Sequence, residues 1–247
     1  MSIQIKTITP AETSAWDTYV NAHPQSTLYH VSGWKNVIEK TYGHKTYYLM
    51  ANEIPEETEE KSYREKKGCK LVNIPQTSKK VSISKIDTKI KEVFESKNVA
   101  NNKAIRAGII GNMFAESSFN LNAYGTDGAV CGSYGLVQWR SSKPGIDRQD
   151  KFAEYCETNN LKTDSLEGQI QWLVIRELIG DPKRTKQLFA VPDSAEGARQ
   201  AALWFAKEIE RCGGCSEATL AEPGTKIIKR QIYAENIYNG KDVTSTK

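Results

Sequence analysis

The chain has 247 residues, of which 38% are hydrophobic and 26% charged, as is typical of a globular protein with one large domain or two small ones. Its net charge of +4 is too small to indicate a nucleic-acid-binding protein, although it favours contact with an anionic polymer. No stretch reaches the roughly 18 consecutive apolar residues of a membrane span, so no membrane insertion is expected. Residues 1–16 lack the apolar core of a secretory signal.

Composition divides the chain into four parts. Residues 1–52 are rich in aromatic side chains and contain all three histidines. Residues 53–85 are expected to form a charged linker, since residues 53–68 offer few apolar side chains to bury and are typical of a solvated linker or exposed loop. Residues 86–240 carry helical periodicity and form the main predicted domain, and residues 241–247 are a tail.

The first part predicts a small strand–helix–helix–strand (βααβ-like) module. Ile3 and Ile5 alternate with polar residues, as in a strand. A helix should follow, because Thr9 suits its N-cap, Pro10 its first position and Glu12 a capping box. The remaining expectations, in chain order, are a buried stripe on that helix (Trp16, Tyr19 and Val20), a second helix over 33–40 and a strand over 45–51.

The main domain is predicted to be mostly helical. Apolar residues recur at helical spacing, as in Ile86, Ile90 and Val93. Glycines interrupt this pattern between residues 123 and 138, which indicates turns or a short β-hairpin. The predicted fold class is therefore α+β and mainly α, with helices over 86–96, 101–115, 148–158, 167–179, 195–209 and 226–238.

The five cysteines leave at least one thiol unpaired, and the odd count fits a reducing compartment better than a disulfide framework. Cys212 and Cys215 have the spacing of a zinc-binding or redox pair, but a zinc site needs further ligands. Free thiols are the preferred interpretation, and neither a metal nor a cofactor is expected.

Glu116 is the main catalytic candidate. It lies at the end of an apolar helix, where removal from water would raise the pKa of its carboxyl. A carboxyl that carries a proton near neutral pH can protonate the oxygen of a glycosidic bond as that bond breaks. The alternative is an ordinary solvated glutamate at a helix end.

A glycan cleft is expected beside Glu116. The glycine-rich segment after it leaves backbone groups open to the amides and hydroxyls of a sugar. Gln138 and Tyr134 can form hydrogen bonds with a sugar, and Ser117 is a further binding candidate. Trp139 either offers a ring face for stacking or belongs to the core.

Residues 86–240 closely resemble the phage tail lysozyme family, within the lysozyme and lytic transglycosylase superfamily. The resemblance rests on the ordered motifs Gly108-Ile109, Gly111-Asn112, Glu116-Ser117, Phe119-Asn120, Gly135-Leu136 and Gln138-Trp139, and it continues through Arg148, the Arg-Glu-Leu at 176–178 and Glu210-Arg211. The pair Glu-Ser and Gly-Leu-x-Gln in this order is a strong motif, whereas its single members are weak.

The resemblance implies cleavage of peptidoglycan, at the β-1,4 bond from N-acetylmuramic acid to N-acetylglucosamine, with Glu116 as general acid. Asp127 is the candidate second carboxylate, acting on water or stabilising an oxocarbenium-like transition state, or else a turn residue. Asp147 is a weaker candidate. Without a second carboxylate, the 6-hydroxyl of the glycan would attack and give the 1,6-anhydro product of a lytic transglycosylase. Glu210 either faces the cleft or pairs with Arg211 or Lys207 at the surface, and a structural role is preferred.

Residues 1–52 resemble the opening of FemAB-like and GNAT-type acyltransferases in the surroundings of Trp16, His23, His30 and Trp34. The segment is too short to form an acyl-donor site, so no transferase activity is expected from it. Two other readings stay open for the chain, a non-catalytic virion or wall-binding module and an acyltransferase-related protein. The expected partners are peptidoglycan strands and phage tail proteins, with the protein carried on a virion or cytoplasmic until delivered to the wall.

Overall fold

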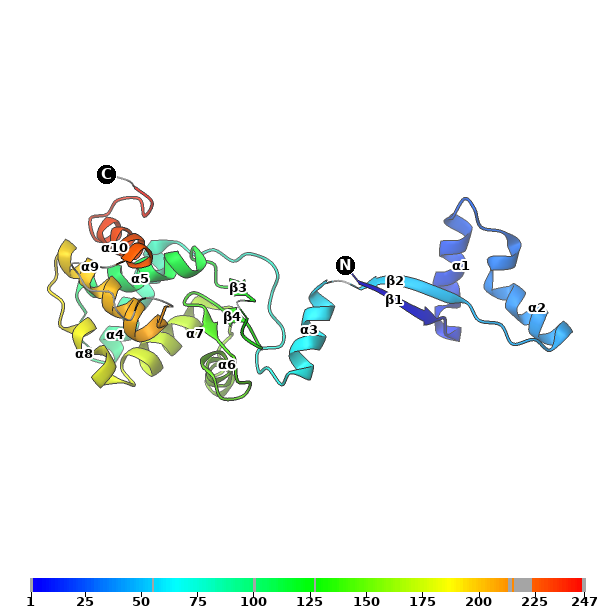
Figure 1. Cartoon of the computed structure of the whole chain (residues 1–247), viewed down its shortest axis with the longest axis horizontal. Coiled ribbons are helices and arrows are strands. Elements are labelled where there is room, and N and C mark those ends of the chain that lie inside the picture. The colour runs from blue at the N-terminus through cyan, green and yellow to red at the C-terminus, as the bar shows by residue number, and fades with distance from the viewer. Residues whose placement is uncertain are drawn as a thin grey trace. The chain divides into compact units, whose positions relative to one another are not determined.

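The computed structural model describes residues 2–54, 56–99, 101–126, 128–212, 215 and 224–245 (Figure 1). Contacts divide the chain into two compact units, Met1–Ser62 and Tyr63–Lys247. Within the described residues, no helix combines the length and the apolar character needed to cross a bilayer.

The first unit has the predicted strand–helix–helix–strand order. Strand β1 (Ser2–Thr7) pairs antiparallel with β2 (Leu49–Ile54), and α1 (Thr13–Ala22) and α2 (Ser32–Tyr42) lie between them in sequence. The predicted capping box is present, because the backbone N–H of Thr9 donates to the Glu12 carboxylate at 2.9 Å.

The predicted buried stripe of the first helix is only partly correct. Val20 is buried, but the Tyr19 side chain is 61% exposed. Trp16 stacks on Tyr48 with ring centroids 5.3 Å apart. Ile8 and Val20 are the only buried hydrophobic residues among the described side chains of this unit, so it has almost no core against which a full apolar stripe could pack.

The second unit contains the mainly helical domain that the sequence predicts. Its elements are the end of α3 (Glu56–Lys66), α4 (Ile83–Ser96), α5 (Lys103–Ser117), α6 (Arg148–Thr158), α7 (Leu166–Gln171), α8 (Pro182–Phe189), α9 (Ala195–Trp204) and α10 (Gly224–Tyr238). Helices α7 and α9 continue as π-helices over Trp172–Leu178 and Phe205–Glu210. In place of a simple hairpin there is a small antiparallel sheet of β3 (Tyr124–Gly125), β4 (Ser133–Tyr134) and β5 (Trp139–Arg140).

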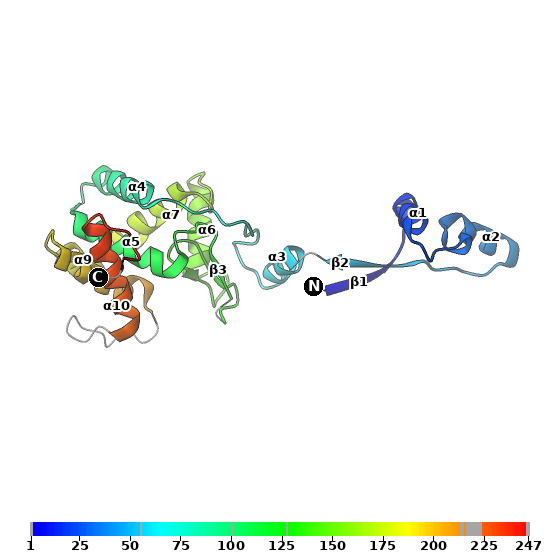
Figure 2. The same ribbon diagram turned by 90° about the horizontal axis from the view of Figure 1, so that it is seen from above.

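Helix α5 lies at the centre of this unit and packs against both α9 and α10 (Figures 1 and 2). Glycines allow the close approach. A Cβ atom on Gly111 would lie 2.8 Å from the backbone nitrogen of Ala234 in α10, and one on Gly108 would lie 2.7 Å from that of Ala202 in α9. The other faces of α5 meet apolar residues such as Ile90 of α4, so the helix is buried over most of its length.

The charged segment 53–68 differs from the solvated loop that its composition predicts. Residues 56–66 form α3, and Arg64 on it is fully buried. The Arg64 guanidinium donates to the Leu71 carbonyl at 2.6 Å, to the Gln149 side chain at 2.6 Å and to the Cys131 carbonyl. These acceptors lie on segments far apart in sequence, so composition alone did not reveal that one arginine of this run would be enclosed.

The cysteines also differ from the free thiols that we expected. Cys69 pairs with Cys131 and Cys212 pairs with Cys215, while Cys156 is free and buried. The fold brings Cys69 and Cys131, 62 residues apart, to a Cα–Cα distance of 5.8 Å, which suits a disulfide. Burial raises the pKa of the Cys156 thiol to about 12. In the described part of the chain, no group of three His, Cys, Asp or Glu side chains could hold a metal ion.

Candidate active site

Glu116 projects from the last turn of α5 into a cavity of the second unit. The helix begins at an Asn102 N-cap, whose side chain accepts from the Ile105 N–H at 2.7 Å, and it ends where Ser118 adopts a left-handed conformation with φ of 50°. The cavity has a volume of about 840 Å³, and the Glu116 side chain is 25% exposed within it. The carboxyl is therefore half enclosed but accessible to a ligand.

The cavity is lined by α5, the small sheet, the π-helix after α9 and α10. Its described walls carry more basic than acidic side chains. The acidic residues are Glu116 and Glu210, and the basic residues are Arg140, Arg148, Arg211, Lys226, Lys229 and Arg230. Such a surface favours a ligand with negative charges.

Arg230 of α10 connects the two acidic residues. Its Nη2 atom forms a very close ion pair with Glu116 Oε1 and lies 3.1 Å from Glu210 Oε2. The Arg230 side chain is only 8% exposed. The close packing of α10 on α5 and α9 therefore holds two carboxyls against one guanidinium.

Glu210 is the more deeply buried of the two carboxyls. Its side chain is 3% exposed, and neither carboxyl oxygen accepts a hydrogen bond from any described residue. Loss of hydration raises the pKa of Glu210 well above its ordinary value, and the nearby charge of Glu116 adds to this effect, while Arg230 and Arg148 oppose it. Of the two positions considered for Glu210, the surface pairing is not found, because the π-helical turn directs the side chain into the cavity.

A second charged pair supports the opposite wall. Arg148, at the start of α6, donates from Nε and Nη2 to the two carboxyl oxygens of Glu177, each at 2.7 Å. This two-point contact fixes the arginine at the edge of the cavity.

The small sheet depends on glycines where its turns are tight. Gly132 has φ of 67°, and a Cβ atom there would lie 2.5 Å from the Gly125 carbonyl oxygen. Gly135 has φ of 83°, and its Cβ atom would lie 2.9 Å from the Gln169 side chain. Both positions therefore require glycine.

Gln138 lies at the cavity wall as predicted. Its Nε2 atom donates to the carbonyls of Ala123 and Gly135 at 3.1 and 3.0 Å, and its backbone has φ of 47°. These bonds hold the turn of the sheet in place and orient the side chain toward the cavity.

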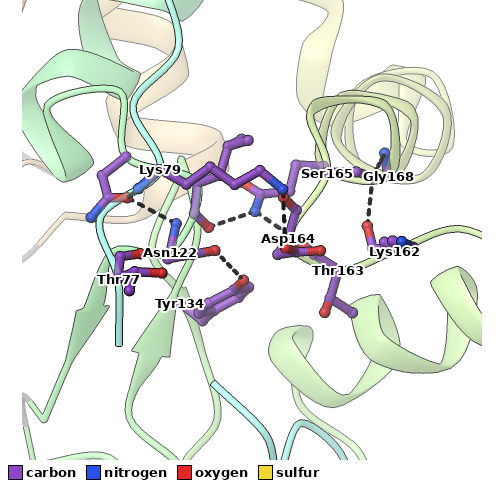
Figure 3. Close-up of polar contacts among 12 residues, drawn as sticks. Thr77, Lys79, Asn122, Tyr134, Lys162, Thr163, Asp164, Ser165 and Gly168 are labelled. Atoms are coloured by element: carbon purple, nitrogen blue, oxygen red, sulfur yellow. Dashed lines mark hydrogen bonds and ion pairs between the residues drawn. The ribbon is translucent and has the colours of Figure 1, made fainter. Parts of the chain in front are cut away.

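Tyr134 and Ser117 do not reach the cavity, although both were predicted to bind substrate. Tyr134 is fully buried, and its hydroxyl is 3.2 Å from the Asn122 side chain, to which it points in Figure 3. The Ser117 hydroxyl donates to the Met113 carbonyl of its own helix at 2.8 Å. Because β-strand neighbours face opposite ways and Ser117 follows Glu116 on the helix, these side chains point into the core.

Trp139 is a core residue, which was one of its two predicted interpretations, so its prediction as a sugar-binding platform is wrong. It is fully buried, and its ring stacks on Phe152 with centroids 4.6 Å apart. Its indole N–H donates to Glu177 at 3.0 Å. No ring face is left for a sugar.

The predicted second carboxylate, Asp127, lies outside the described residues. Asp147, the weaker candidate, precedes α6, where its carboxylate accepts from the backbone N–H groups of Ser142 and Lys143 at 2.7 and 2.8 Å. It has the contacts of a residue that holds a turn.

Comparison with protein families shows the family to which this domain belongs. The family model of phage tail lysozymes matches residues 85–240, from the first turn of α4 to just beyond α10. The chain belongs to the phage tail lysozyme family. A search of curated proteins found no match. Membership indicates a lysozyme-like, peptidoglycan-cleaving protein. The matched region of the chain contains all the residues that line the described cavity.

Sequence reasoning did not identify Arg230. The residue stands in a basic helix that resembles many solvated helices, and no local pattern links position 230 to position 116, which is 114 residues away. The only available signal was Lys226, Lys229 and Arg230 on one helix, which indicates a basic surface but no ion-pair partner.

Proposed function

We propose that the domain is a muramidase that hydrolyses the β-1,4 bond between N-acetylmuramic acid and N-acetylglucosamine, with Glu116 as the general acid. The observation that carries this proposal is the position of the Glu116 carboxyl in a cavity of about 840 Å³. Ligand pockets commonly have volumes of roughly 300–1,000 Å³, so several sugar-sized groups fit.

The chemistry follows from that position. Glu116 transfers its proton to the glycosidic oxygen, and the C–O bond breaks with its electron pair going to that oxygen. The sugar that remains has oxocarbenium character, which a nearby carboxylate stabilises. Water then attacks the anomeric carbon and loses a proton, and we assign Asp127 as the base that accepts it.

The basic walls support peptidoglycan over a neutral polysaccharide. The peptide stems of peptidoglycan carry carboxylates, whereas chitin has no negative charge. Arg211, Lys226 and Lys229 line the cavity and favour the charged polymer. We further infer that the protein acts on the wall as part of a phage or prophage tail.

Lytic transglycosylation is the second candidate, and the burial of Glu210 favours it. Glu210 is the second carboxyl described in the cavity, yet its side chain is only 3% exposed. A carboxyl so enclosed is poorly placed to activate bulk water. If Asp127 does not take that role, the 6-hydroxyl of the muramic acid residue attacks instead.

Mass spectrometry of the products tests the proposal. The protein is incubated with purified peptidoglycan, and the released muropeptides are analysed before and after borohydride reduction. We expect fragments with a reducible muramic acid end. Fragments lighter by one water molecule and resistant to reduction would instead identify a transglycosylase. Binding to the wall without any product would indicate a non-catalytic module, and acyl transfer without wall cleavage would indicate an acyltransferase-related protein.

A further inference from the structure

Two carboxyls of the cavity contact the same arginine. Glu116 from α5 and Glu210 from the π-helix after α9 both contact the single guanidinium of Arg230 from α10. The other charged residues that line this cavity are basic, namely Arg140, Arg148, Arg211, Lys226 and Lys229. Arg148 is held by both carboxyl oxygens of Glu177, and Arg230 forms ion pairs with both Glu116 and Glu210.

Glu210 is poorly suited to carry a charge in this place. Its carboxyl oxygens are buried and receive no hydrogen bond from the described residues, and the contact with Arg230 lies within ion-pair distance but without hydrogen-bond geometry. An ionised carboxylate in such surroundings is strongly disfavoured. Burial has the largest effect and raises the pKa of Glu210, the charge of Arg230 opposes that rise, and the neighbouring Glu116 adds to it.

Both carboxyls contact one guanidinium, so a charge on one of them affects the other. Two ionised carboxylates have only acceptor atoms and cannot hydrogen-bond to each other, whereas one shared proton creates a donor between them. The pair holding one proton has one negative charge, which the charge of Arg230 balances. The proton can then lie on either acid without any change in the charge of the buried cluster.

We infer that Glu210 is a positioning residue for catalysis, which shares one proton with Glu116 and keeps it available to the glycosidic oxygen at neutral pH. This inference rests on the proposed role of Glu116 as general acid. Without Glu210, the Arg230 charge compensates Glu116 alone, and protonating Glu116 leaves a buried positive charge. With Glu210, the same proton only moves between two carboxyls.

The pair loses one proton and regains one proton in each turnover. The shared proton passes through Glu116 to the glycosidic oxygen, and the C–O electron pair goes to that oxygen. The cluster then has one negative charge, which faces the oxocarbenium-like sugar as it forms. The attacking water loses its proton to Asp127, which releases it to solvent, and the pair takes up one proton from solvent before the next turnover.

The pH dependence of kcat/KM on peptidoglycan tests this role. In Glu210→Gln we expect the alkaline fall in activity to move to lower pH by about one unit or more. Activity at pH 7 then drops by about 10-fold, since one pH unit is a tenfold change in protonation, while activity at pH 5 changes by less than about 3-fold. Glu210→Asp, which keeps a titrating carboxyl, should restore most of the wild-type profile.

Asp87→Asn is the matched control. Asp87 of α4 lies 2.7 Å from the guanidinium of Arg106 on α5, outside the cavity, so this substitution also removes the acidic partner of an arginine. Its pH profile should match the wild type. An equal loss at every pH in Glu210→Gln, or an unchanged profile, would overturn the inference.

A readout independent of activity separates this inference from the proposed function. In protein with ¹³C-labelled glutamate carboxyls, the Glu210 signal is assigned as the one that disappears in Glu210→Asp. We expect it to have the chemical shift of a protonated carboxyl at pH 6. A shift typical of an ionised carboxylate would contradict the inference, even if peptidoglycan is cleaved. A protonated Glu210 in a protein that does not cleave peptidoglycan would leave the proton-sharing pair intact but refute the proposed function.

Discussion

At the scale of single residues, the position of a charge relative to water determines most of what the candidate site can do. Glu116 and Glu210 have the same side chain, yet one is 25% and the other 3% exposed. The difference places one carboxyl within reach of a ligand and encloses the other. Burial raises the pKa of Glu210, and the charges of Arg230 and Arg148 oppose that rise.

The enclosed carboxyl has a consequence for stability that can be measured. Because folding raises the pKa of Glu210, the folded protein holds its proton at pH values where the unfolded chain has already released it. This stabilisation is complete below the ordinary pKa of 4.5 and is lost as pH rises through the higher pKa of the folded state. We therefore expect the Tm of Glu210→Gln, relative to that of the wild type, to increase as pH rises from 4 to 9. A Tm difference that does not vary with pH would contradict the raised pKa.

The buried position of Trp139 leads to a second prediction. Trp139→Phe removes the N–H that reaches Glu177 and leaves a small cavity beside Phe152, so we expect a loss of about 1–3 kcal/mol in the free energy of unfolding. Because the ring does not face the cavity, KM for peptidoglycan should change by less than about 2-fold. Denaturant unfolding and steady-state kinetics measure the two effects. A large rise in KM at unchanged stability would restore the sugar-stacking role.

The site residues that line the cavity as expected are those whose position follows from local sequence. Glu116 stands where an apolar helix ends, and Gln138 follows a glycine-rich segment, while the roles of both residues stay predictions. Trp139 was ambiguous, since both a core and a sugar surface use aromatic rings. Glu210 and Arg230 were missed as a pair because their contact depends on how α10 packs against α9, which no local pattern records.

At the scale of helices, the site depends on the spacing between α5 and α10. Gly111 allows that spacing, because a Cβ atom there would also lie 3.0 Å from the carbonyl oxygen of Arg230 itself. The glycine on α5 and the arginine on α10 are therefore in direct register. A change in one helix should move the charged group carried by the other.

Gly111→Ala tests this dependence. Alanine favours a helix over glycine by about 1 kcal/mol, but overpacking against α10 costs typically 1–3 kcal/mol. We expect a net loss of stability and a fall in kcat of about 10-fold as Arg230 shifts from Glu116. Gly33→Ala in α2, where a Cβ atom meets nothing within 4 Å, is the control and should leave both properties of the second unit unchanged. A fully active and stable Gly111→Ala protein would show that the spacing does not matter.

Helical periodicity predicted most helices of the second unit, and α6 was predicted with its observed bounds of Arg148–Thr158. The exceptions have physical reasons. Helix α8 is short and mostly polar, with only Thr185 and Leu188 buried, so its periodicity is weak. Helix α3 has a strongly charged sequence, and its one enclosed side chain is an arginine whose partners lie elsewhere in the chain.

At the scale of the whole molecule, the two units differ in how much apolar surface they enclose. The second unit has a large continuous core that extends from Leu71 and Ile74 to Ala234. The first has two buried hydrophobic residues among its described side chains and several exposed aromatic residues, including Tyr19, Tyr29 and Tyr42. The domain boundaries expected from composition stay a prediction, and stability measurements can locate them.

Shortening the chain from its N-terminus provides that measurement. The protein reduced to residues 63–247 keeps Arg64 and Cys69, so we expect it to cleave peptidoglycan within about 3-fold of the wild type and to unfold at a similar temperature. The protein reduced to residues 76–247 loses Arg64, the disulfide and two core residues, and should have a lower Tm by more than 5 °C, since roughly 2–4 kcal/mol is typical for a disulfide alone. Equal stability of both shortened proteins would place the boundary later, near residue 86.

The central claim is that Glu116 supplies the proton that breaks the glycan, and its substitution is the most direct measurement. The initial rate of muropeptide release from purified peptidoglycan is compared for the wild type, Glu116→Gln and the control Glu95→Gln, which alters an exposed glutamate of α4. We expect release by Glu116→Gln to fall by a factor of about 10² to 10⁴, as for the loss of a general acid, while Glu95→Gln stays at the wild-type rate. A folded Glu116→Gln protein that releases muropeptides at the wild-type rate would contradict the account.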